Sequence, residues 1–164
     1  AGFAYALKSG YDIIITLDGD GQHDPKEIPA FLQAASCSYD IGVIVGCRTL
    51  NYHSMPHARR LANWFMSKVV SLIARQHIPD SQCGFRLLRR QAITELKLTS
   101  THFDLETELL LAASRRGWKI GSVPIKTIYQ KQRSHICPII DGMRFARLIF
   151  RYLFIPIYKD RRTP

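Results

Sequence analysis

Residues 18–25 read Asp18-Gly19-Asp20-Gly21-Gln22-His23-Asp24-Pro25, and they decide the fold of this 164-residue chain. They directly follow an apolar, largely β-branched run, Ile13-Ile14-Ile15-Thr16-Leu17, which predicts a fully buried strand. Two carboxylates one residue apart therefore leave the C-terminal end of a core strand, where open α/β sheets bind their ligands. The glycines at 19 and 21 let the backbone turn tightly beside a bulky ligand.

The side chains of this stretch are mostly hard ligands. Asp18, Asp20 and the amide oxygen of Gln22, with His23 as a further option, suit Mg²⁺ or Mn²⁺ holding phosphates. Helix capping is the alternative explanation for the acidic residues. It accounts for Asp24, which is followed by a proline and, three residues later, by a glutamate. Capping does not account for the first two carboxylates, so the pattern favours a metal site.

The net charge of +10 is distributed unevenly along the chain. Residues 1–47 hold two basic and six acidic residues, whereas residues 48–164 hold 21 basic and seven acidic residues. An acidic segment that suits a metal, followed by a basic segment, predicts a polyanionic partner such as phosphates, nucleic acid or anionic lipid. For any single lysine or arginine, a generally basic soluble surface is the plainer explanation.

The length suits one domain with a real core. The four cysteines include no CxxC pair, which argues against a zinc site. Cys37 and Cys47 lie in or beside apolar stretches and are expected to be buried thiols, as suits a reducing cytoplasm. No uncharged apolar run reaches the roughly 18 residues that a membrane-spanning helix needs. Residues 1–8 already have the pattern of a helix interior, so we expect a truncated N-terminus.

Hydrophobic periodicity predicts an alternation of strands and helices. Strands are expected over residues 11–17, 41–47, 85–88 and 118–128, and helices over 1–9, 25–36, 57–76, 89–96, 103–116 and 138–158. The order strand, helix, strand over residues 11–47 implies a right-handed parallel crossover.

Two of the expected helices carry basic stripes. The helix over 57–76 follows the strand-end Arg48 and bears a polar arc, for which a phosphate-binding role and a solvated face both remain open: Arg59, Arg60, Asn63, Ser67 and Ser71. The helix over 138–158 bears Arg144, Arg147 and Arg151 beside a wide apolar arc that includes Phe145, Leu148, Ile149, Tyr152, Leu153 and Phe154. Such a helix suits a membrane interface, although packing on the sheet would also explain it.

Seven short segments, taken in order, resemble one family. They are residues 17–25, the strand-end Gly46-Cys47-Arg48, residues 80–86 (Asp-Ser-Gln-Cys-Gly-Phe-Arg), residues 103–108 (Phe-Asp-Leu-Glu-Thr-Glu), Val123-Pro124-Ile125, Thr127-Ile128-Tyr129 and Ser134-His135. This ordered set resembles the family 2 inverting glycosyltransferases with the GT-A fold. Its nearest branch looks like the dolichol-phosphate mannose synthases and their bacterial polyprenyl-phosphate relatives.

The resemblance implies an α/β fold with a Rossmann-like, mainly parallel sheet flanked by helices. Residues 1–137 would form the catalytic domain without its first strand and helix, and residues 138–164 an amphipathic membrane-interface helix with a basic tail. The implied enzyme moves a hexose from a nucleotide-diphosphate sugar to a dolichyl or undecaprenyl phosphate, with inversion. It would work with Mg²⁺ or Mn²⁺ on an anionic membrane surface at the cytoplasmic face, and it would bind no nucleic acid.

The resemblance also implies roles for particular residues. Asp18, Asp20 and Gln22 would surround the metal and the donor diphosphate, with Arg133 and Ser134 on a loop over the donor. The acceptor phosphate would meet Arg48, Arg60 (or Arg59, one position away in register), Asn63 and Ser67. The residues expected to take part in catalysis are Asp20, Arg48 and Glu106.

The chemistry fits these residue types. Negative charge grows on the leaving nucleoside diphosphate, and a divalent metal and arginines stabilise that charge. A phosphate acceptor is already ionised and needs no strong general base. A hydroxyl acceptor, as in cell-wall or surface polysaccharide synthesis, would need one. Glu106 or Glu108 would then be the candidate, and because they are two residues apart on a helix they should point to different sides.

Two other classes are weaker explanations. A phosphatase with Asp18 as nucleophile would need a later pair of adjacent acidic residues, and none follows Asp24. A basic nucleic-acid-binding module would explain the charge of the second half, but no RNA-binding or helix-turn-helix signature supports it.

Overall fold

The computed structural model describes residues 2–48, 55–100, 104–126 and 138–154. Its elements in chain order are α1 (Gly2–Lys8), β1 (Ile13–Thr16), the 3₁₀ turn η1 (Pro25–Glu27), α2 (Ile28–Ser36), β2 (Ile41–Cys47), α3 (His57–Ala74), β3 (Arg86–Arg89), α4 (Arg90–Thr94), α5 (Asp104–Arg115), β4 (Lys119–Pro124) and α6 (Pro138–Phe154). Every expected helix and strand is present within these residues, with ends that differ by a few positions.

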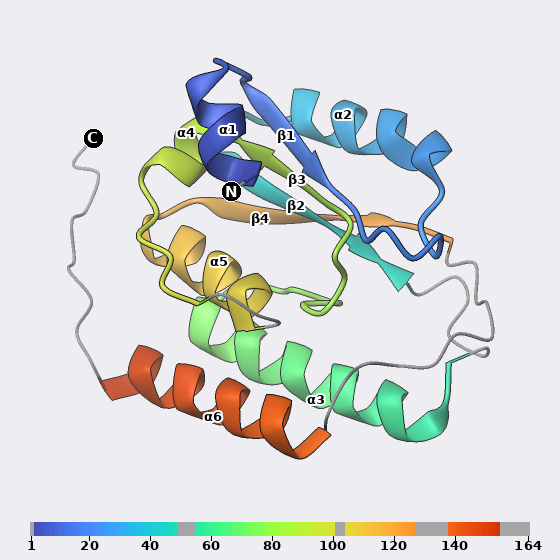
Figure 1. Ribbon diagram of the computed structural model, residues 1–164, viewed down its shortest axis with the longest axis vertical. Helices are drawn as coiled ribbons and strands as arrows, with labels where there is room; N and C mark the ends of the chain where they lie inside the picture. The colour runs from blue at the N-terminus through green and yellow to red at the C-terminus, as the bar shows by residue number, and fades with distance from the viewer. Residues whose placement is uncertain (1, 49–54, 101–103, 127–137, 155–164) are drawn as a thin grey trace.

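The four described strands form one mixed sheet in the order β1-β3-β2-β4 (Figure 1). β3 is antiparallel to both β1 and β2, so β1 and β2 run in the same direction, as the predicted parallel crossover requires. β4 pairs in parallel with β2. Three of the described strands therefore share one direction, and β3 runs against them between β1 and β2.

Helices cover the sheet and then one another. α2 contacts β2, β3 and β4, and α5 contacts β2 and β4, with α2 above the sheet and α5 below it in Figure 1. α3 and α6 both pack on α5 and form the lowest layer of that view. The sheet edge that carries residues 18–24 lies to the right in the same view, away from the N-terminus.

The core centres on β2 and β3. Residues 42–47 of β2 are all buried, as expected for a strand that pairs on both sides. Phe31 of α2 stacks on Phe85 just before β3, with ring centroids 4.4 Å apart and neither side chain exposed. Full burial of a side chain of this size stabilises the fold by about 1.5–3 kcal/mol.

Two burial expectations are wrong. β1 is not a fully buried strand, because it is the outermost strand of the described sheet: Ile13 is 37% exposed, and its neighbours Ile14 and Ile15 are only partly buried. Cys37 is exposed because it caps the C-terminal end of α2, beyond the buried Phe31 and Ala35. Cys47 is buried as expected, and so is Cys83. Burial raises the pKa of the Cys83 thiol to about 12, so it stays a neutral core residue.

The expected apolar arc of the last helix is split by its packing. Phe145, Leu148 and Tyr152 are buried in the core that α6 shares with α5, so they are not free to meet a membrane. Residues 155–164, where the helix was expected to end, lie outside the described residues. None of the described helices is long and apolar enough to span a bilayer.

Candidate active site at the end of strand β1

The end of β1 is tied to the segment that precedes β3. Thr16 Oγ1 donates a hydrogen bond of 3.1 Å to the carbonyl of Gly84. After it, the backbone turns through Gly21 in the left-handed region (φ 75°), and Asp20 Oδ1 accepts the Gln22 N–H at 3.0 Å. Asp24 Oδ1 accepts the Lys26 N–H at 2.9 Å at the start of η1, so the expected cap is confirmed.

Asp18 lies at the mouth of a small cavity. Its side chain is about half exposed, and one carboxylate oxygen lies 3.3 Å from His23 Nε2. That hydrogen bond lowers the pKa of Asp18, and the positive charges of Arg48 and Arg86 act in the same direction. A Cβ on Gly84 would come within 2.4 Å of Asp18 Oδ1. Any residue other than glycine at position 84 would therefore push the Asp18 carboxylate out of its present position.

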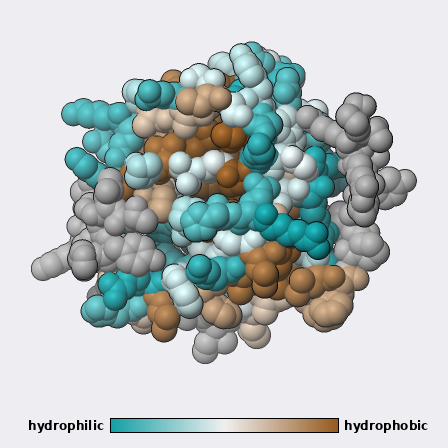
Figure 2. Space-filling view, turned by 180° about the vertical axis from the view of Figure 1, so that it is seen from behind, coloured by the Kyte–Doolittle hydropathy of each residue, from teal (hydrophilic) through white to brown (hydrophobic). Residues whose placement is uncertain are grey.

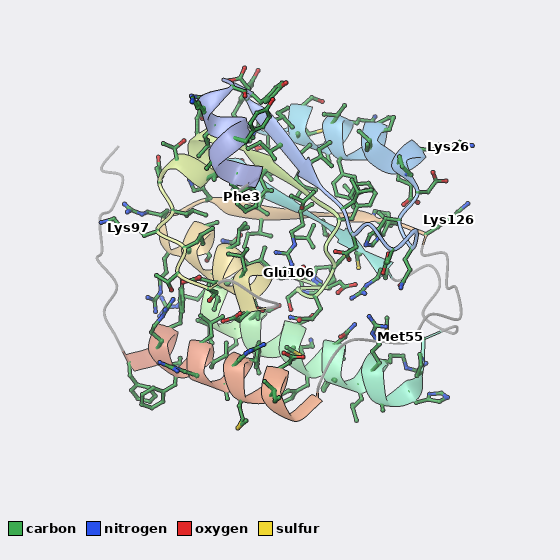
Figure 3. All side chains as sticks on the ribbon, viewed as in Figure 1. Phe3, Lys26, Met55, Lys97, Glu106 and Lys126 are labelled. Carbon is green, nitrogen blue, oxygen red and sulfur yellow. The ribbon has the colours of Figure 1, made fainter. Side chains whose placement is uncertain are left out.

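The cavity measures about 150 Å³ and is lined by both polar and apolar side chains. Asp18, Arg86 and Glu106 supply its charges. The apolar part comes from Phe3 of α1, Leu17 just after β1, Leu88 of β3, and Leu105 and Leu109 of α5. Figure 3 shows Glu106 near the centre of the molecule, between the sheet and the lower helices. The cavity is therefore a pocket with three ionisable groups and a largely apolar floor.

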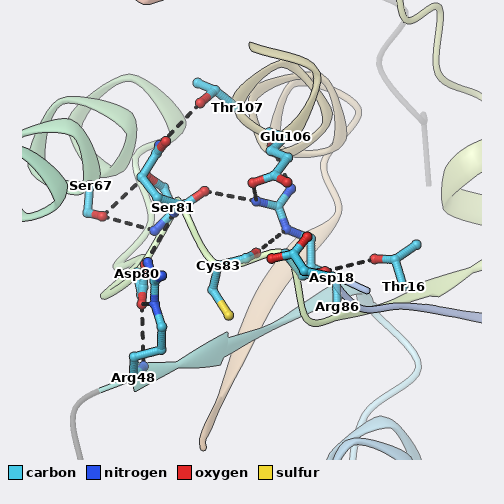
Figure 4. Close-up of polar contacts among 12 residues, drawn as sticks. Thr16, Asp18, Arg48, Ser67, Asp80, Ser81, Cys83, Arg86, Glu106 and Thr107 are labelled. Carbon is cyan, nitrogen blue, oxygen red and sulfur yellow. Dashed lines mark hydrogen bonds and ion pairs between the residues drawn. The ribbon is translucent and has the colours of Figure 1, made fainter. Parts of the chain in front are cut away.

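Arg86 ties these groups together from a buried position (Figure 4). Its Nε donates to the Cys83 carbonyl at 2.8 Å, and its Nη1 donates to the Glu106 carbonyl at 2.7 Å. Its Nη2 donates to the Ser81 carbonyl at 2.9 Å and to Glu106 Oε2 at 3.2 Å. Arg86 lies in a motif that carried the family resemblance, but the sequence alone suggested no role for it, because its partners are remote in the chain.

Glu106 and Glu108 point to different sides of α5, as predicted. Burial raises the pKa of Glu106, against the effect of the nearby Arg86 charge. Glu108 lies on the far side, where it binds the N–H groups of Thr99 and Ser100 and forms an ion pair with Arg151. Only Glu106 faces the cavity.

Arg48 is placed in a buried ion pair rather than on an open surface. Its Nε donates to Asp80 Oδ2 at 2.7 Å and its Nη2 to Asp80 Oδ1 at 2.8 Å, with both side chains under a tenth exposed (Figure 4). This bidentate geometry fixes the guanidinium plane at the end of β2. Asp80 was a second residue without a predicted role, since a carboxylate 32 positions away gives no local signal.

The polar arc of α3 divides into two parts. Ser67 accepts the Ser81 N–H at 2.9 Å and shares a hydroxyl contact of 3.2 Å with it, so it fastens the segment that carries Asp80. Ser71 binds the Ile78 backbone in the same manner. Arg60 lies near the helix start, with Nη2 3.1 Å from His57 Nδ1.

The remaining predicted acceptor and donor residues have fewer described contacts. Asn63 Nδ2 lies 3.7 Å from Met55 Sδ, and Arg59 is partly buried at the start of α3. Arg133 and Ser134 lie outside the described residues.

The donor set at residues 18–22 fits an open metal site rather than a closed one. Within the described residues, no three His, Cys, Asp or Glu side chains converge as metal ligands. Asp18 offers a half-exposed carboxylate beside the glycine cradle, and Asp20 offers the oxygen that does not accept from Gln22. Mg²⁺ commonly takes one or two carboxylates and completes its shell with water and substrate phosphates, so two carboxylates here suffice.

The fold matches that of a solved glycosyltransferase. Glucosyl-3-phosphoglycerate synthase from Mycobacterium tuberculosis, in complex with uridine diphosphate, superposes with a TM-score of 0.66 at 15% identity, over 93% of this chain and 53% of that one. The chain has the GT-A fold, with a mixed β-sheet flanked by helices and an acidic loop at the end of a strand.

Sequence comparison points to one branch of these enzymes. The chain is 33% identical over 136 residues to UDP-N-acetylglucosamine–dolichyl-phosphate N-acetylglucosaminyltransferase of Methanococcus voltae, covering 78% of this chain and 53% of that protein. It is 26% identical over 131 residues to undecaprenyl-phosphate mannosyltransferase of Micrococcus luteus, covering 76% and 53%. An uncharacterized protein of Methanocaldococcus jannaschii is 30% identical over 161 residues, covering 93% and 65%.

These findings confirm the resemblance that the motifs suggested: the relatives with named activities are polyprenyl-phosphate sugar transferases. The chain spans between about half and two thirds of the length of these relatives. No known family profile matches the chain.

Proposed function

We propose that this chain is part of a glycosyltransferase that moves a hexose from a nucleotide-diphosphate sugar to a polyprenyl phosphate with inversion. The observation that carries the proposal is the pair of carboxylates, Asp18 and Asp20, at the C-terminal end of β1 beside a cavity that also holds Arg86 and Glu106. The similarity to transferases named for dolichyl and undecaprenyl phosphate supports the acceptor class.

In this proposal Asp18, Asp20 and Gln22 hold Mg²⁺ or Mn²⁺ together with the donor diphosphate. The metal, when bound, supplies positive charge to the leaving diphosphate. A solved structure with the same fold, at a TM-score of 0.54 and 14% identity, is a complex with Mn²⁺ and UDP-glucose, which supports a divalent ion. His23 orients Asp18 through its 3.3 Å contact, and this hydrogen bond lowers the pKa of the Asp18 carboxyl. Arg133 and Ser134 would close over the donor phosphates.

The acceptor phosphate would approach from the α3 side of the cavity. Arg48, Arg59 or Arg60, Asn63 and Ser67 are the residues proposed to meet it. In the present geometry Arg48 is paired with Asp80, and Ser67 with Ser81. Arg48 and Ser67 would therefore act mainly by holding the segment with Asp80 and Ser81 in place. Either could contact the acceptor directly only if the acceptor displaced Asp80 or Ser81. The enzyme would work at the cytoplasmic face of a membrane with an anionic surface.

A second acceptor class is favoured by one specific observation. Burial raises the pKa of Glu106 beside the cavity, and a carboxylate tuned in this way is a suitable general base for a hydroxyl acceptor. Transfer to a hydroxyl in surface polysaccharide synthesis is therefore the alternative function. The two functions differ in whether the reaction needs Glu106.

The experiment is a transfer assay with the full-length protein. Labelled nucleotide sugars are offered with polyprenyl phosphate and Mn²⁺ or Mg²⁺, and the lipid product is extracted and identified. The proposal predicts a glycosyl-phosphate lipid that disappears with a chelator and in the Asp20→Asn variant. A product formed only on hydroxyl acceptors would replace the proposal with the alternative, and transfer that persists with a chelator would overturn the metal's role.

A further inference from the structure

Arg86 carries its charge inside the molecule. Figure 2 shows hydrophilic side chains across much of one face of the molecule, whereas only 3% of Arg86 is exposed. An arginine is rarely buried to this extent unless its N–H groups find acceptors. The acceptors here are the carbonyls of Ser81, Cys83 and Glu106 and the carboxylate of Glu106. These four hydrogen bonds use four of the five N–H groups of a guanidinium.

Two of these bonds close the turn that precedes β3. The carbonyls of Ser81 and Cys83 lie five and three positions before Arg86, and its guanidinium bridges them (Figure 4). The other two bonds go to the carbonyl and the carboxylate of Glu106, in the first turn of α5. One guanidinium thus holds the shape of the turn over residues 81–84 and fastens that turn to α5.

Gly84, at the end of the 81–84 turn, sets the place of the Asp18 carboxylate. Its carbonyl accepts the Thr16 hydroxyl at 3.1 Å, which ties the end of β1 to the turn. Its Cα faces Asp18 so closely that an added Cβ would lie 2.4 Å from Oδ1 and 2.6 Å from Oδ2. A shift of the backbone at residue 84 would therefore move the Asp18 carboxylate or open a gap beneath it.

Arg89 offers a comparison on the same strand. It lies three positions after Arg86 on β3, so the two side chains point to opposite faces of the sheet. Arg89 Nε donates to the Ile41 carbonyl at 2.9 Å, and its Nη2 donates to the carbonyls of Ser38 and Ala35. Each arginine therefore ties β3 to neighbouring segments through three backbone carbonyls.

The register of β3 places the two arginines at different distances from the acidic loop. Arg86 pairs with Thr16, the last residue of β1, and Arg89 pairs with Ile13, the first. Three residues of a strand span roughly 10 Å. Of the two arginines, only Arg86 adjoins the loop that carries Asp18, so Arg89 is a matched control for a purely structural role.

We propose that Arg86 is a positioning residue of the metal site: it holds the 81–84 turn in the shape that places the Asp18 carboxylate for a divalent cation. The inference rests on the proposed function, which assigns the metal to Asp18, Asp20 and Gln22. It adds a residue that acts through the backbone of Gly84 and needs no contact with the metal or the donor.

Charge and position predict opposite effects of Arg86 on metal binding. Arg86 and Asp18 line the same cavity, and the positive charge of Arg86 repels a cation bound there. If charge alone mattered, removing Arg86 would strengthen Mn²⁺ binding. If Arg86 positions Asp18, removing its hydrogen bonds should weaken binding, even when a positive charge is kept. Loss of a residue that orients a metal ligand typically lowers metal affinity by about 10–100-fold.

The first test compares lysine variants of the two arginines in the full-length protein. Arg86→Lys and Arg89→Lys each keep the charge and lose the fork of N–H groups, so both should unfold at lower urea concentration than wild type. Mn²⁺ is titrated where circular dichroism shows each variant folded, with free Mn²⁺ followed by electron paramagnetic resonance. We expect binding weaker by about tenfold or more for Arg86→Lys and wild-type affinity for Arg89→Lys. Wild-type affinity in Arg86→Lys, or an equal loss in both variants, overturns the proposal.

Chemical rescue is the second test. Arg86→Ala leaves room for a free guanidinium ion beside the cavity that Arg86 lines. We expect this variant to bind Mn²⁺ more weakly than wild type, and guanidinium chloride far below unfolding concentrations to restore affinity, whereas equal sodium chloride does not. Restoration cannot come from charge, because an added cation opposes Mn²⁺. Tighter Mn²⁺ binding by Arg86→Ala, or no effect of guanidinium, overturns the proposal. Unfolding of both Arg86 variants, with Arg89→Lys folded, would also overturn it by assigning Arg86 to the fold alone.

The outcomes separate this role from the proposed function. Transfer of sugar to polyprenyl phosphate by the full-length protein, with wild-type Mn²⁺ affinity in Arg86→Lys, would refute the role of Arg86 and keep the function. Weaker Mn²⁺ binding by Arg86→Lys but not by Arg89→Lys, together with absent transfer, would refute the proposed function and keep the role of Arg86. Absent Mn²⁺ binding by wild type would overturn the metal site and the role of Arg86 together.

Discussion

Glu106 and Glu108 lie two residues apart on α5 and face opposite sides of it, and each is paired with an arginine. Glu106 faces the cavity and receives one side-chain hydrogen bond, from Arg86 Nη2 at 3.2 Å. Burial raises its pKa. Glu108 is completely buried, yet its pKa is lowered. Burial alone would raise the pKa of Glu108, but hydrogen bonds from Ser100 and Thr99 outweigh that effect.

The number of donors, rather than the depth of burial, decides the direction of each shift. Glu108 accepts the Thr99 N–H and hydroxyl, each at 2.9 Å, and the Ser100 N–H at 2.7 Å, and it also pairs with Arg151. It joins α5, the 99–100 segment and α6 into one unit. Among the described residues, Glu106 receives only the Arg86 side-chain hydrogen bond, and its carboxylate has a raised pKa next to the proposed donor site. The same residue type thus stabilises the fold on one face of α5 and, on the other face, lines the cavity as the proposed base for a hydroxyl acceptor.

Replacing Glu108 should have the largest effect on stability. Glu108→Gln leaves the Arg151 guanidinium without its carboxylate and gives the 99–100 segment a weaker acceptor. Breaking a buried charged pair costs about 3–5 kcal/mol, and we expect the low end, about 3 kcal/mol, because Arg151 is partly exposed. Urea unfolding followed by circular dichroism measures the loss. If Glu108→Gln and Glu106→Gln have equal free energies of unfolding, or if Glu108→Gln is the more stable, the structural role given to Glu108 is contradicted.

The pH dependence of stability should sharpen the same contrast. A carboxyl whose folded pKa is depressed contributes stability that is fully present above its unfolded pKa, about 4.3, and lost as the pH falls through the folded value. Wild type should therefore exceed Glu108→Gln by a constant margin between pH 7 and pH 5, and the margin should shrink below about pH 4. Thermal unfolding across this range measures it. A margin that stays constant down to pH 2 would contradict the role given to Glu108.

Replacing Glu106 should change stability least. Glu106→Gln removes a charge that burial already disfavours, and Arg86 keeps three backbone carbonyls, so we expect a loss under about 1 kcal/mol. Activity then separates the two acceptors. Transfer to polyprenyl phosphate should remain near wild type, whereas transfer to a hydroxyl should fall by roughly 10²–10⁴-fold if Glu106 is the base. A large loss with the phosphate acceptor would mean that Glu106 has another part in the reaction.

The features that the sequence predicted well are local. The β1 run, the acidic loop, the Asp24 cap and the opposite directions of Glu106 and Glu108 all follow from spacings of a few residues. The place of β3 between β1 and β2 does not, because a pairing such as Thr16 with Arg86 joins residues 70 positions apart. For the same reason the partners of Arg48 and Arg86 became visible only in the structure.

The last helix shows the limit of amphipathic patterns. Its apolar arc is too wide for a single contact, and the pattern cannot say which part packs on protein. The structure assigns Phe145, Leu148 and Tyr152 to the core and leaves Phe150, Leu153 and Phe154 exposed. Arg151 belongs to the Glu108 pair, so it is not one of the cations that a lipid surface would meet. Helix α3 likewise leaves large apolar side chains exposed, among them Leu61, Phe65 and Leu72.

Mn²⁺ titration of three forms of the full-length protein tests the central claim, that residues 18–22 hold the metal. The forms are wild type, Asp20→Asn and Asp24→Asn, and free Mn²⁺ is followed by electron paramagnetic resonance. Asp24 is the matched control because it lies in the same loop but caps η1, a task that asparagine also performs. We predict equal affinity for wild type and Asp24→Asn, and at least tenfold weaker binding for Asp20→Asn. Equal affinity in all three forms would contradict the account.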